Sequence, residues 1–167
     1  MKVGLKEINE FPAEVSIFEN TQEIGFAIDG VTFVDGITAK LSIQRTETEY
    51  YIRGVCAAKV DLECARCLEP ARENISGDID MIAIRESGSV ERFVDVEDVV
   101  ELDVNEELDF SEQVRQALFT ALPLKPLCRP DCRGLCPTCG GNRNETPCNC
   151  TKETPDSRWD ALKDLID

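Results

Sequence analysis

The 167-residue sequence contains no histidine. This absence excludes hydrolase sites in which histidine is the general base, and it excludes every metal site with an imidazole ligand. Any metal site in this sequence must therefore be built from cysteine, aspartate or glutamate.

Basic residues and long apolar runs are also scarce. There are 18 Lys and Arg against 33 Asp and Glu, which gives a formal net charge of -15. This balance argues against nucleic-acid binding through a globally basic surface. Residues 1–11 lack the apolar core of a signal peptide, and no stretch reaches the ~18 apolar residues of a transmembrane helix. We therefore expect a cytoplasmic protein without a membrane partner, whose cysteines stay reduced.

The first ninety residues predict β-structure, because apolar side chains alternate with polar ones. The alternation runs from Gly36 to Ile43, from Tyr50 to Leu62 and from Ile75 to Ala83. This is the period of strands that bury one face. Because no helical pattern separates these strands, we expect a twisted antiparallel sheet. The predicted fold class is α+β, with a core domain over residues 1–127.

An acidic segment at residues 91–109 precedes the main helix. Its composition predicts a solvated loop, or alternatively a surface for a basic partner through Glu97, Asp98 and Glu101. A helix is then expected to begin at Asp109, with Glu112 at the spacing of a capping box. Its predicted core face is apolar: Phe110, Val114, Ala117, Leu118, Ala121 and Leu122. Pro123 ends the helix.

The remaining chain predicts a loop-rich module at residues 128–152 and a short helix within 153–167. The second helix would pack on the core through Trp159, the one tryptophan. Residues 125–152 are net basic, so Arg129, Arg133, Arg143 and Lys152 form a possible local contact with RNA. The segment has no aromatic side chain, which weakens a base-stacking mode of RNA binding.

Eight of the nine cysteines form four close pairs: Cys64 and Cys67, Cys128 and Cys132, Cys136 and Cys139, Cys148 and Cys150. Two such pairs can offer four thiolates to one metal ion, so four pairs predict two four-cysteine zinc sites. Soft thiolate ligands also suit an iron–sulfur cluster, which is the less favoured alternative. Cys56 lies on the apolar face of its strand, and we expect it to be a buried structural thiol.

Spacing favours one grouping of the pairs without excluding another. Cys136, Cys139, Cys148 and Cys150 lie close together in the chain and look self-sufficient, which leaves Cys64 and Cys67 to join Cys128 and Cys132. A metal shared by these pairs would link the sheet to the segment after the main helix. The alternative places the four cysteines from Cys128 to Cys139 on one ion.

The motif Cys64-Ala65-Arg66-Cys67 resembles the CxRC motif of the YceD family, the large ribosomal RNA subunit accumulation proteins. Further matches are the Leu108–Glu112 and Ala121–Pro126 segments, the Cys132–Gly140 segment, Asn144, Cys148 to Cys150, and Trp159 to Leu162. The family includes bacterial and plastid proteins required for normal accumulation of 23S-type ribosomal RNA. Some members keep the first cysteine pair and lose the later cluster, which favours the grouping of Cys64 and Cys67 with Cys128 and Cys132.

The resemblance implies a non-enzymatic factor in large ribosomal subunit biogenesis. The expected partners are a large-subunit ribosomal protein, ribosomal RNA or both, and no small-molecule substrate. The alternative is a thiol redox protein or sensor that uses the C-x-x-C pairs. A reactive pair normally lies at a helix N-terminus, however, whereas Cys64 ends a strand pattern and Cys136 lies in a Gly- and Pro-rich loop. A metal hydrolase is disfavoured because four thiolates leave no open coordination position.

Overall fold

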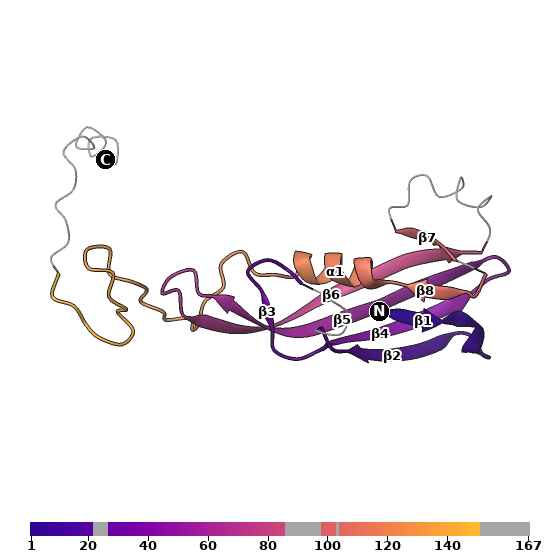
Figure 1. The fold of residues 1–167 in the computed structure, drawn as a ribbon, viewed down its shortest axis with the longest axis horizontal. Helices are drawn as coiled ribbons and strands as arrows, with labels where there is room; N and C mark the ends of the chain where they lie inside the picture. Colours follow the sequence, from indigo (N-terminus) through magenta and orange to yellow (C-terminus); the bar gives the residue numbers. More distant parts are fainter. Residues whose placement is uncertain (22–26, 86–97, 103, 151–167) are drawn as a thin grey trace, which may run out of the picture.

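The structure is a computed structural model that describes residues 1–21, 27–85, 98–102 and 104–150. Its dominant feature is a long antiparallel hairpin formed by β5 (Glu49–Glu63) and β6 (Pro70–Ile84). At ~3.3 Å per residue, strands of this length extend about 50 Å. The molecule is accordingly elongated along the hairpin (Figure 1).

The other strands extend the sheet on both sides of the hairpin. The sheet order is β2-β4-β5-β6-β7, and β3 pairs separately with β5. The added strands are β2 (Ala13–Glu19), β3 (Thr32–Phe33), β4 (Ile37–Arg45) and β7 (Val99–Glu101). The predicted α+β class is therefore confirmed, with a sheet that is antiparallel at every pairing but one.

The exception is β7, which runs parallel to β6. The strands of the first ninety residues pair antiparallel throughout, as predicted, and β7 adds this parallel edge from the segment that follows them. A parallel pair needs a connection of about a dozen residues or more to bring the chain back to the start of its neighbour. The interval between Ile84 and Val99 provides that length.

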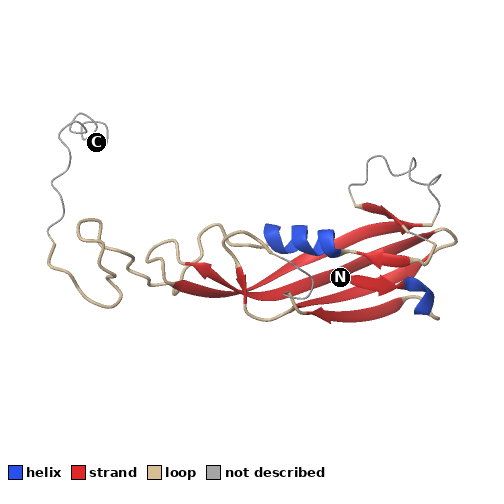
Figure 2. Cartoon of the chain, viewed as in Figure 1, coloured by secondary structure: helices blue, strands red, loops and turns tan. Residues whose placement is uncertain are grey.

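A second layer covers one face of the central strands (Figure 2). It contains α1 (Ser111–Thr120), the short 3-10 helix Leu5–Glu7, and the small sheet of β1 (Lys2–Gly4) and β8 (Glu107–Asp109). Because β7 and β8 both lie within residues 91–109, the prediction of a solvated loop is wrong for their part of that segment. The buried side chains of Leu102 and Leu108 explain why: they contribute to the main core.

The main helix presents the predicted apolar face, but its start differs from the prediction. Phe110, Val114 and Leu118 are fully buried. The helix begins at Ser111, and Asp109 Oδ1 accepts hydrogen bonds from the Ser111 N–H at 3.0 Å and from its hydroxyl at 2.6 Å. Glu112 pairs with Arg115 at 2.9 Å rather than with the chain before the helix. The capping box therefore does not form, because Arg115 provides a charged partner for Glu112 one turn along.

The core lies between the sheet and this second layer, where the alternation of apolar residues placed it. Gly77 of β6 allows α1 to approach closely, because a Cβ atom there would lie 2.4 Å from the Ala117 carbonyl oxygen. Cys56 is fully buried, as predicted, and its thiol donates to the Gly77 carbonyl at 3.5 Å. Burial raises the pKa of Cys56, which keeps the thiol protonated and unreactive.

The hairpin continues past α1, and the segment at residues 128–150 follows its far end (Figure 1). In this segment the structure has turns and one isolated bridge between Leu135 and Asn142. Among the described residues, no helix is both long and apolar enough to cross a membrane. The predicted C-terminal helix, Glu97 and Lys152 lie outside the described residues. The boundary between a core domain and a module at residue 128 stays a prediction.

Two four-cysteine sites at one end of the sheet

The eight paired cysteines gather into two groups. The first cysteine set consists of Cys64, Cys67, Cys128 and Cys132, and the second of Cys136, Cys139, Cys148 and Cys150. Within each set, all four sulfur atoms lie within 4.8 Å of one another. This is the grouping that the sequence favoured over four consecutive cysteines on one ion. All nine cysteines lie in the described residues, and none forms a disulfide.

The first two ligand positions belong to the turn between β5 and β6. The Cys64 N–H donates to the Glu69 carbonyl at 2.9 Å, and the Leu68 N–H donates to the Cys64 carbonyl at 3.0 Å. Leu68 has a φ of 63°, in the left-handed region that tight turns use. The turn therefore brings two sulfur atoms to the same side of the hairpin end.

Arg66 connects this turn to the segment that carries Cys128 and Cys132 through hydrogen bonds. Its Nη1 donates to the Cys132 carbonyl at 2.8 Å, and its own carbonyl accepts from the Leu135 N–H at 2.9 Å. Gly134 has a φ of +68°, and a Cβ atom there would lie 2.9 Å from the Arg66 carbonyl oxygen. The C-x-R-C pattern by itself assigns no role to Arg66. In the structure, Arg66 links the turn between β5 and β6 to residues 132–135 by hydrogen bonds.

The geometry of the first set suits a tetrahedral metal. Zinc–sulfur bonds of about 2.3 Å in a tetrahedron place the sulfur atoms about 3.8 Å apart. Cys64 Sγ lies 3.8 Å from Cys132 Sγ, and Cys67 Sγ lies 3.5 Å from Cys128 Sγ. Cys64 is fully buried, and Cys67 and Cys132 are each 3% exposed. With Ala71 they form a small cluster that is separate from the main core.

The second set is local and more open. The Gly140 N–H donates to the Cys136 carbonyl at 2.8 Å, and the Cys136 N–H donates to the Gly141 carbonyl at 2.9 Å. Gly140 has a φ of +71°, which closes the turn after Cys139. Only Cys136 is buried, while Cys139 and Cys150 are exposed. This set therefore depends on its own tight turn and has little apolar cover.

The thiols of the first set differ in pKa, because some of their sulfur atoms accept hydrogen bonds from amide groups. The backbone N–H of Cys128 bonds to the Cys64 sulfur and lowers the pKa of Cys64 to about 6. The side-chain amide of Asn144 likewise lowers the pKa of Cys132. Burial raises the pKa of Cys128 to about 12. A divalent cation at the centre would favour the thiolate form of all four.

The thiols of the second set also differ in pKa. Backbone N–H groups of Cys139 and Thr138 lower the pKa of Cys136 to about 6. The hydrogen bond with the Cys139 thiol raises the pKa of Cys150 to about 12. In both sets, amide donors thus stabilise negative charge on sulfur, which is the arrangement found around metal-bound thiolates.

The predicted partner-binding residues do not form one surface. Arg129, Arg133 and Arg143 are exposed in the segment that carries the cysteines, and Arg129 Nε lies 3.7 Å from Asp131 Oδ1. Asp98 and Glu101 belong to the β7 region at the opposite end of the hairpin (Figure 1). Any partner that contacts both groups must therefore span the molecule, or two different partners must be involved.

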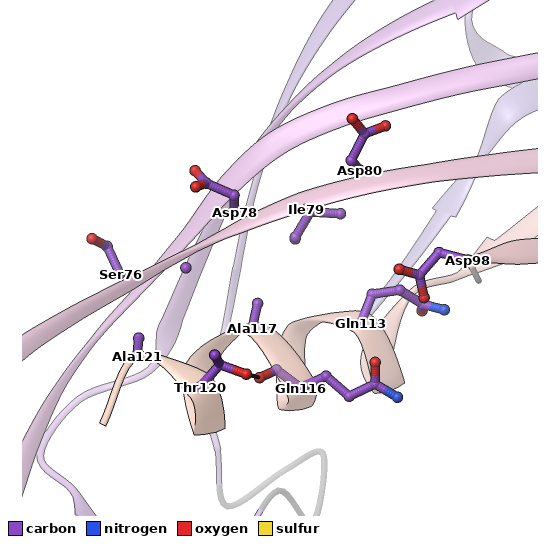
Figure 3. Close-up of a pocket in the computed structure, with 11 residues that line it drawn as sticks. Ser76, Asp78, Ile79, Asp80, Asp98, Gln113, Gln116, Ala117, Thr120 and Ala121 are labelled. Atoms are coloured by element: carbon purple, nitrogen blue, oxygen red, sulfur yellow. Dashed lines mark hydrogen bonds between the residues drawn. The ribbon is translucent and has the colours of Figure 1, made fainter. Parts of the chain in front are cut away.

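A hollow of about 440 Å³ lies between β6 and α1, away from the cysteines (Figure 3). Asp98 and Gln113 lie at one end of it, whereas Asp78 and Asp80 point away from the helix. Asp80 Oδ2 also accepts from Arg53 Nε at 3.0 Å. The described residues that line the hollow include no cysteine, so it is separate from the two sulfur sites.

The fold and the sites together define a class of protein: a long sheet covered on one face by a helix and a small second sheet, with two four-cysteine clusters at one end. The family described as large ribosomal RNA subunit accumulation protein YceD matches residues 52–166, more than half of the chain. The chain belongs to the YceD family, and the resemblance noted from the sequence is confirmed. The matched range includes both cysteine sets.

Individual relatives extend this comparison. An uncharacterized protein of Mycobacterium tuberculosis H37Rv is 33% identical over 127 residues, covering 75% of this chain and 60% of its own length. The chloroplastic "Large ribosomal RNA subunit accumulation protein YCED homolog 1" of Zea mays is 23% identical over 141 residues, covering 68% of this chain and 48% of its own length. The protein of the same name from Arabidopsis thaliana is 22% identical over 160 residues, covering 80% and 50% respectively.

The chain thus spans about half to three fifths of the length of these relatives. No solved structure matches it significantly.

Proposed function

We propose that this protein is a non-enzymatic factor in large ribosomal subunit biogenesis that supports accumulation of 23S-type ribosomal RNA. The observation that carries the proposal is the family match over residues 52–166, which includes every cysteine of both sets. The plant relatives bear names that state this role for them. We also propose a cytoplasmic location, the compartment in which bacterial ribosomes assemble, whereas the named plant relatives are chloroplastic.

We further propose that each cysteine set binds one Zn²⁺. Sulfur spacings of 3.8 Å and 3.5 Å in the first set support tetrahedral coordination. Amide donors to sulfur around both sets support bound thiolates. Because four protein ligands fill a tetrahedral ion, neither site would offer a position for water or substrate. The metals would therefore hold the fold in place and take no part in catalysis.

The charge distribution suggests how such a factor contacts its partners. Arg129, Arg133 and Arg143 are exposed beside the cysteines and are suited to phosphate groups of ribosomal RNA. Asp98 and Glu101 lie at the other end and are suited to a basic ribosomal protein. With its charges separated in this way, the protein would bring an RNA element and a ribosomal protein together during assembly.

Affinity capture from cells at physiological salt tests this proposal. The unmodified protein is expected to capture large-subunit RNA and protein. Reversing the charge at Arg129, Arg133 and Arg143 should reduce RNA capture, and reversing Asp98 and Glu101 should reduce protein capture. Lys40→Glu, an exposed change on the outer face of the sheet, serves as the matched control. Capture of no large-subunit component by the unmodified protein would contradict the proposal.

A thiol redox function is the second candidate, and one observation favours it. Cys136 combines a pKa lowered to about 6 by backbone N–H groups with an exposed neighbour, Cys139, in a C-x-x-C pair. Metal analysis of the reduced protein separates the two candidates. About two zinc ions per chain support the scaffold, whereas metal-free protein with rapidly reacting thiols supports the redox function.

A further inference from the structure

The two cysteine sets are joined by one side chain, that of Asn144. This residue lies between Cys139 and Cys148 in the sequence, inside the loop of the second set. Its Nδ2 nevertheless lies 3.3 Å from the sulfur of Cys132, a member of the first set. A ligand of one site therefore receives a hydrogen bond from the loop that forms the other.

The hydrogen bonds determine how the amide of Asn144 is oriented. Its Oδ1 accepts from the Arg133 N–H at 2.7 Å, and an N–H donor requires an oxygen as its partner. The NH₂ group must then point toward Cys132, where it donates to sulfur. A primary amide satisfies both groups at once, because it carries the acceptor and the donor on two different atoms of one short side chain.

The position of Asn144 depends on the fold of the second set. The Asn144 N–H donates to Asn142 Oδ1 at 3.0 Å, and the neighbouring Arg143 N–H donates to the Gly134 carbonyl at 2.9 Å. Asn142 also forms a bridge with Leu135. The turn from Cys136 to Gly141 lies inside this bridge and is closed by the Cys136 N–H to Gly141 carbonyl bond at 2.9 Å. A metal that holds this turn therefore also holds Asn144 in place.

We propose that Asn144 couples the two sites, so that metal at the second set strengthens metal binding at the first. The amide N–H stabilises the negative charge of the Cys132 thiolate, and ordering the second loop in advance lowers the entropy lost in making that contact. By linkage, metal at the first set strengthens binding at the second by the same factor. The coupling rests on the metal sites of the proposed function.

Metal titration of the full chain against a competing chelator tests the coupling. The variants are Asn144→Ala, which removes both side-chain bonds, and Asn144→Asp, which keeps the acceptor for the Arg133 N–H and loses the donor to sulfur. Asn74→Ala, on the outer face of the sheet, is the control. Partners in the outer shell of a metal typically change affinity by about 10–100-fold. We expect a loss of that size at the first set in both Asn144 variants and no loss in the control.

A double-mutant cycle then separates coupling from simple loss of a contact. Replacing Cys136 and Cys139 by serine is expected to weaken the first site. Adding Asn144→Ala to that variant should cause little further loss, because the amide is no longer held against Cys132. Fully additive losses would overturn the proposal, as would a first site with unchanged affinity in Asn144→Asp.

Cobalt substitution gives a readout that a purely structural role would not change. A hydrogen bond to sulfur stabilises its lone pairs, so the charge-transfer band from thiolate to Co²⁺ at the first site should move to lower energy in Asn144→Asp. An unchanged band would overturn the proposal. If the unmodified chain bound no metal, the metal sites and the coupling would both be wrong, whereas two independent sites would overturn the coupling alone.

Discussion

The two cysteine sets use the same four ligands in opposite ways. In the first set, the sulfur atoms in contact at 3.5 Å and 3.8 Å come from residues 61 and 68 positions apart in the chain, and three of the four cysteines are buried. In the second set, all four cysteines come from one loop, and only Cys136 is buried. One site closes a long loop, whereas the other closes a short one.

This difference shows what each metal would contribute to the fold. The hairpin of β5 and β6 extends past α1 (Figure 1), and beyond Leu62 the end of the hairpin no longer contributes to the main core. There the first set and Ala71 form their own small apolar cluster. A metal in that cluster would replace the core that the hairpin end lacks, and closing a long loop removes more chain entropy than closing a short one. The second set would order only its own loop and Asn144.

The largest predicted effect is the loss of the first site. Replacing Cys64 and Cys67 by serine should release one metal and lower the free energy of unfolding by about 4 kcal/mol when free zinc is about 1,000 times its Kd. Thermal unfolding followed by circular dichroism, with metal analysis, measures both changes. Cys56→Ala is the control, and it should keep both metals because Cys56 belongs to the main core. Unchanged metal content in the double variant would contradict this assignment.

Loss of the second site should have a smaller effect on the sheet. Replacing Cys136 and Cys139 by serine should release one metal and leave β5 and β6 protected in hydrogen exchange, while residues 134–146 lose protection. The exposure of Cys139 and Cys150 also predicts that a chelator removes metal from the second set first. Global unfolding of the serine variant would mean that the two sites are not separable in this way.

A pair of glycines tests the comparison with single substitutions. Gly134 and Gly140 have φ angles of +68° and +71°, so an alanine at either position costs about 1–2 kcal/mol. At Gly134 the new Cβ would also lie 2.9 Å from the Arg66 carbonyl oxygen, whereas at Gly140 it would meet nothing within 4 Å. Gly134→Ala should therefore weaken the first site more than Gly140→Ala weakens the second. Equal losses of metal affinity in chelator competition would show that the contact with Arg66 does not contribute to the first site.

The same contrast explains what could be predicted from the sequence. Cysteine spacing is local, so the four pairs and the self-contained second set could be identified directly. Alternation of apolar residues likewise located β4, β5 and β6. The roles of Arg66 and Asn144 could not be derived, because each acts on Cys132 through a contact that spacing does not encode.

The solvated-loop prediction is wrong for the β7 and β8 part of the acidic segment for a related reason. Its many carboxylates suggested a solvated loop, but composition does not reveal that Leu102 and Leu108 enter the core. It also does not reveal that Glu106 finds a cationic partner, since Arg85 lies at the end of a different strand. In the described part of this segment, residues 98–102 and 104–109, long-range packing and ion pairing thus decide the structure, and neither leaves a periodic pattern in the sequence.

The smallest predicted effect concerns the end of the sheet opposite the cysteines. There an ion pair and a hydrogen bond of Glu106, and no cysteine cluster, hold the chain segments together. Glu106 Oε2 accepts from Tyr50 Oη at 2.9 Å and from Arg85 Nη2 at 3.0 Å. Although burial acts in the other direction, these two bonds leave the pKa of Glu106 lowered. A lowered pKa in the folded state contributes stability above the ordinary glutamate pKa, and that stability is lost as the pH falls through the folded-state value.

Glu106→Gln should therefore reduce the free energy of unfolding by about 1 kcal/mol at neutral pH, as expected for a partly buried hydrogen bond. The gap from the unmodified protein should narrow as the pH falls below the ordinary glutamate pKa and through the lowered folded-state pKa of Glu106, because the carboxyl group of the unmodified protein then becomes protonated. Urea unfolding at several pH values, in the presence of chelator so that metal release does not contribute, measures this gap. A gap that is independent of pH would mean that Glu106 acts through packing alone. Because this end contains none of the eight paired cysteines, adding chelator should leave the gap unchanged, in contrast to every difference predicted for the two cysteine sets.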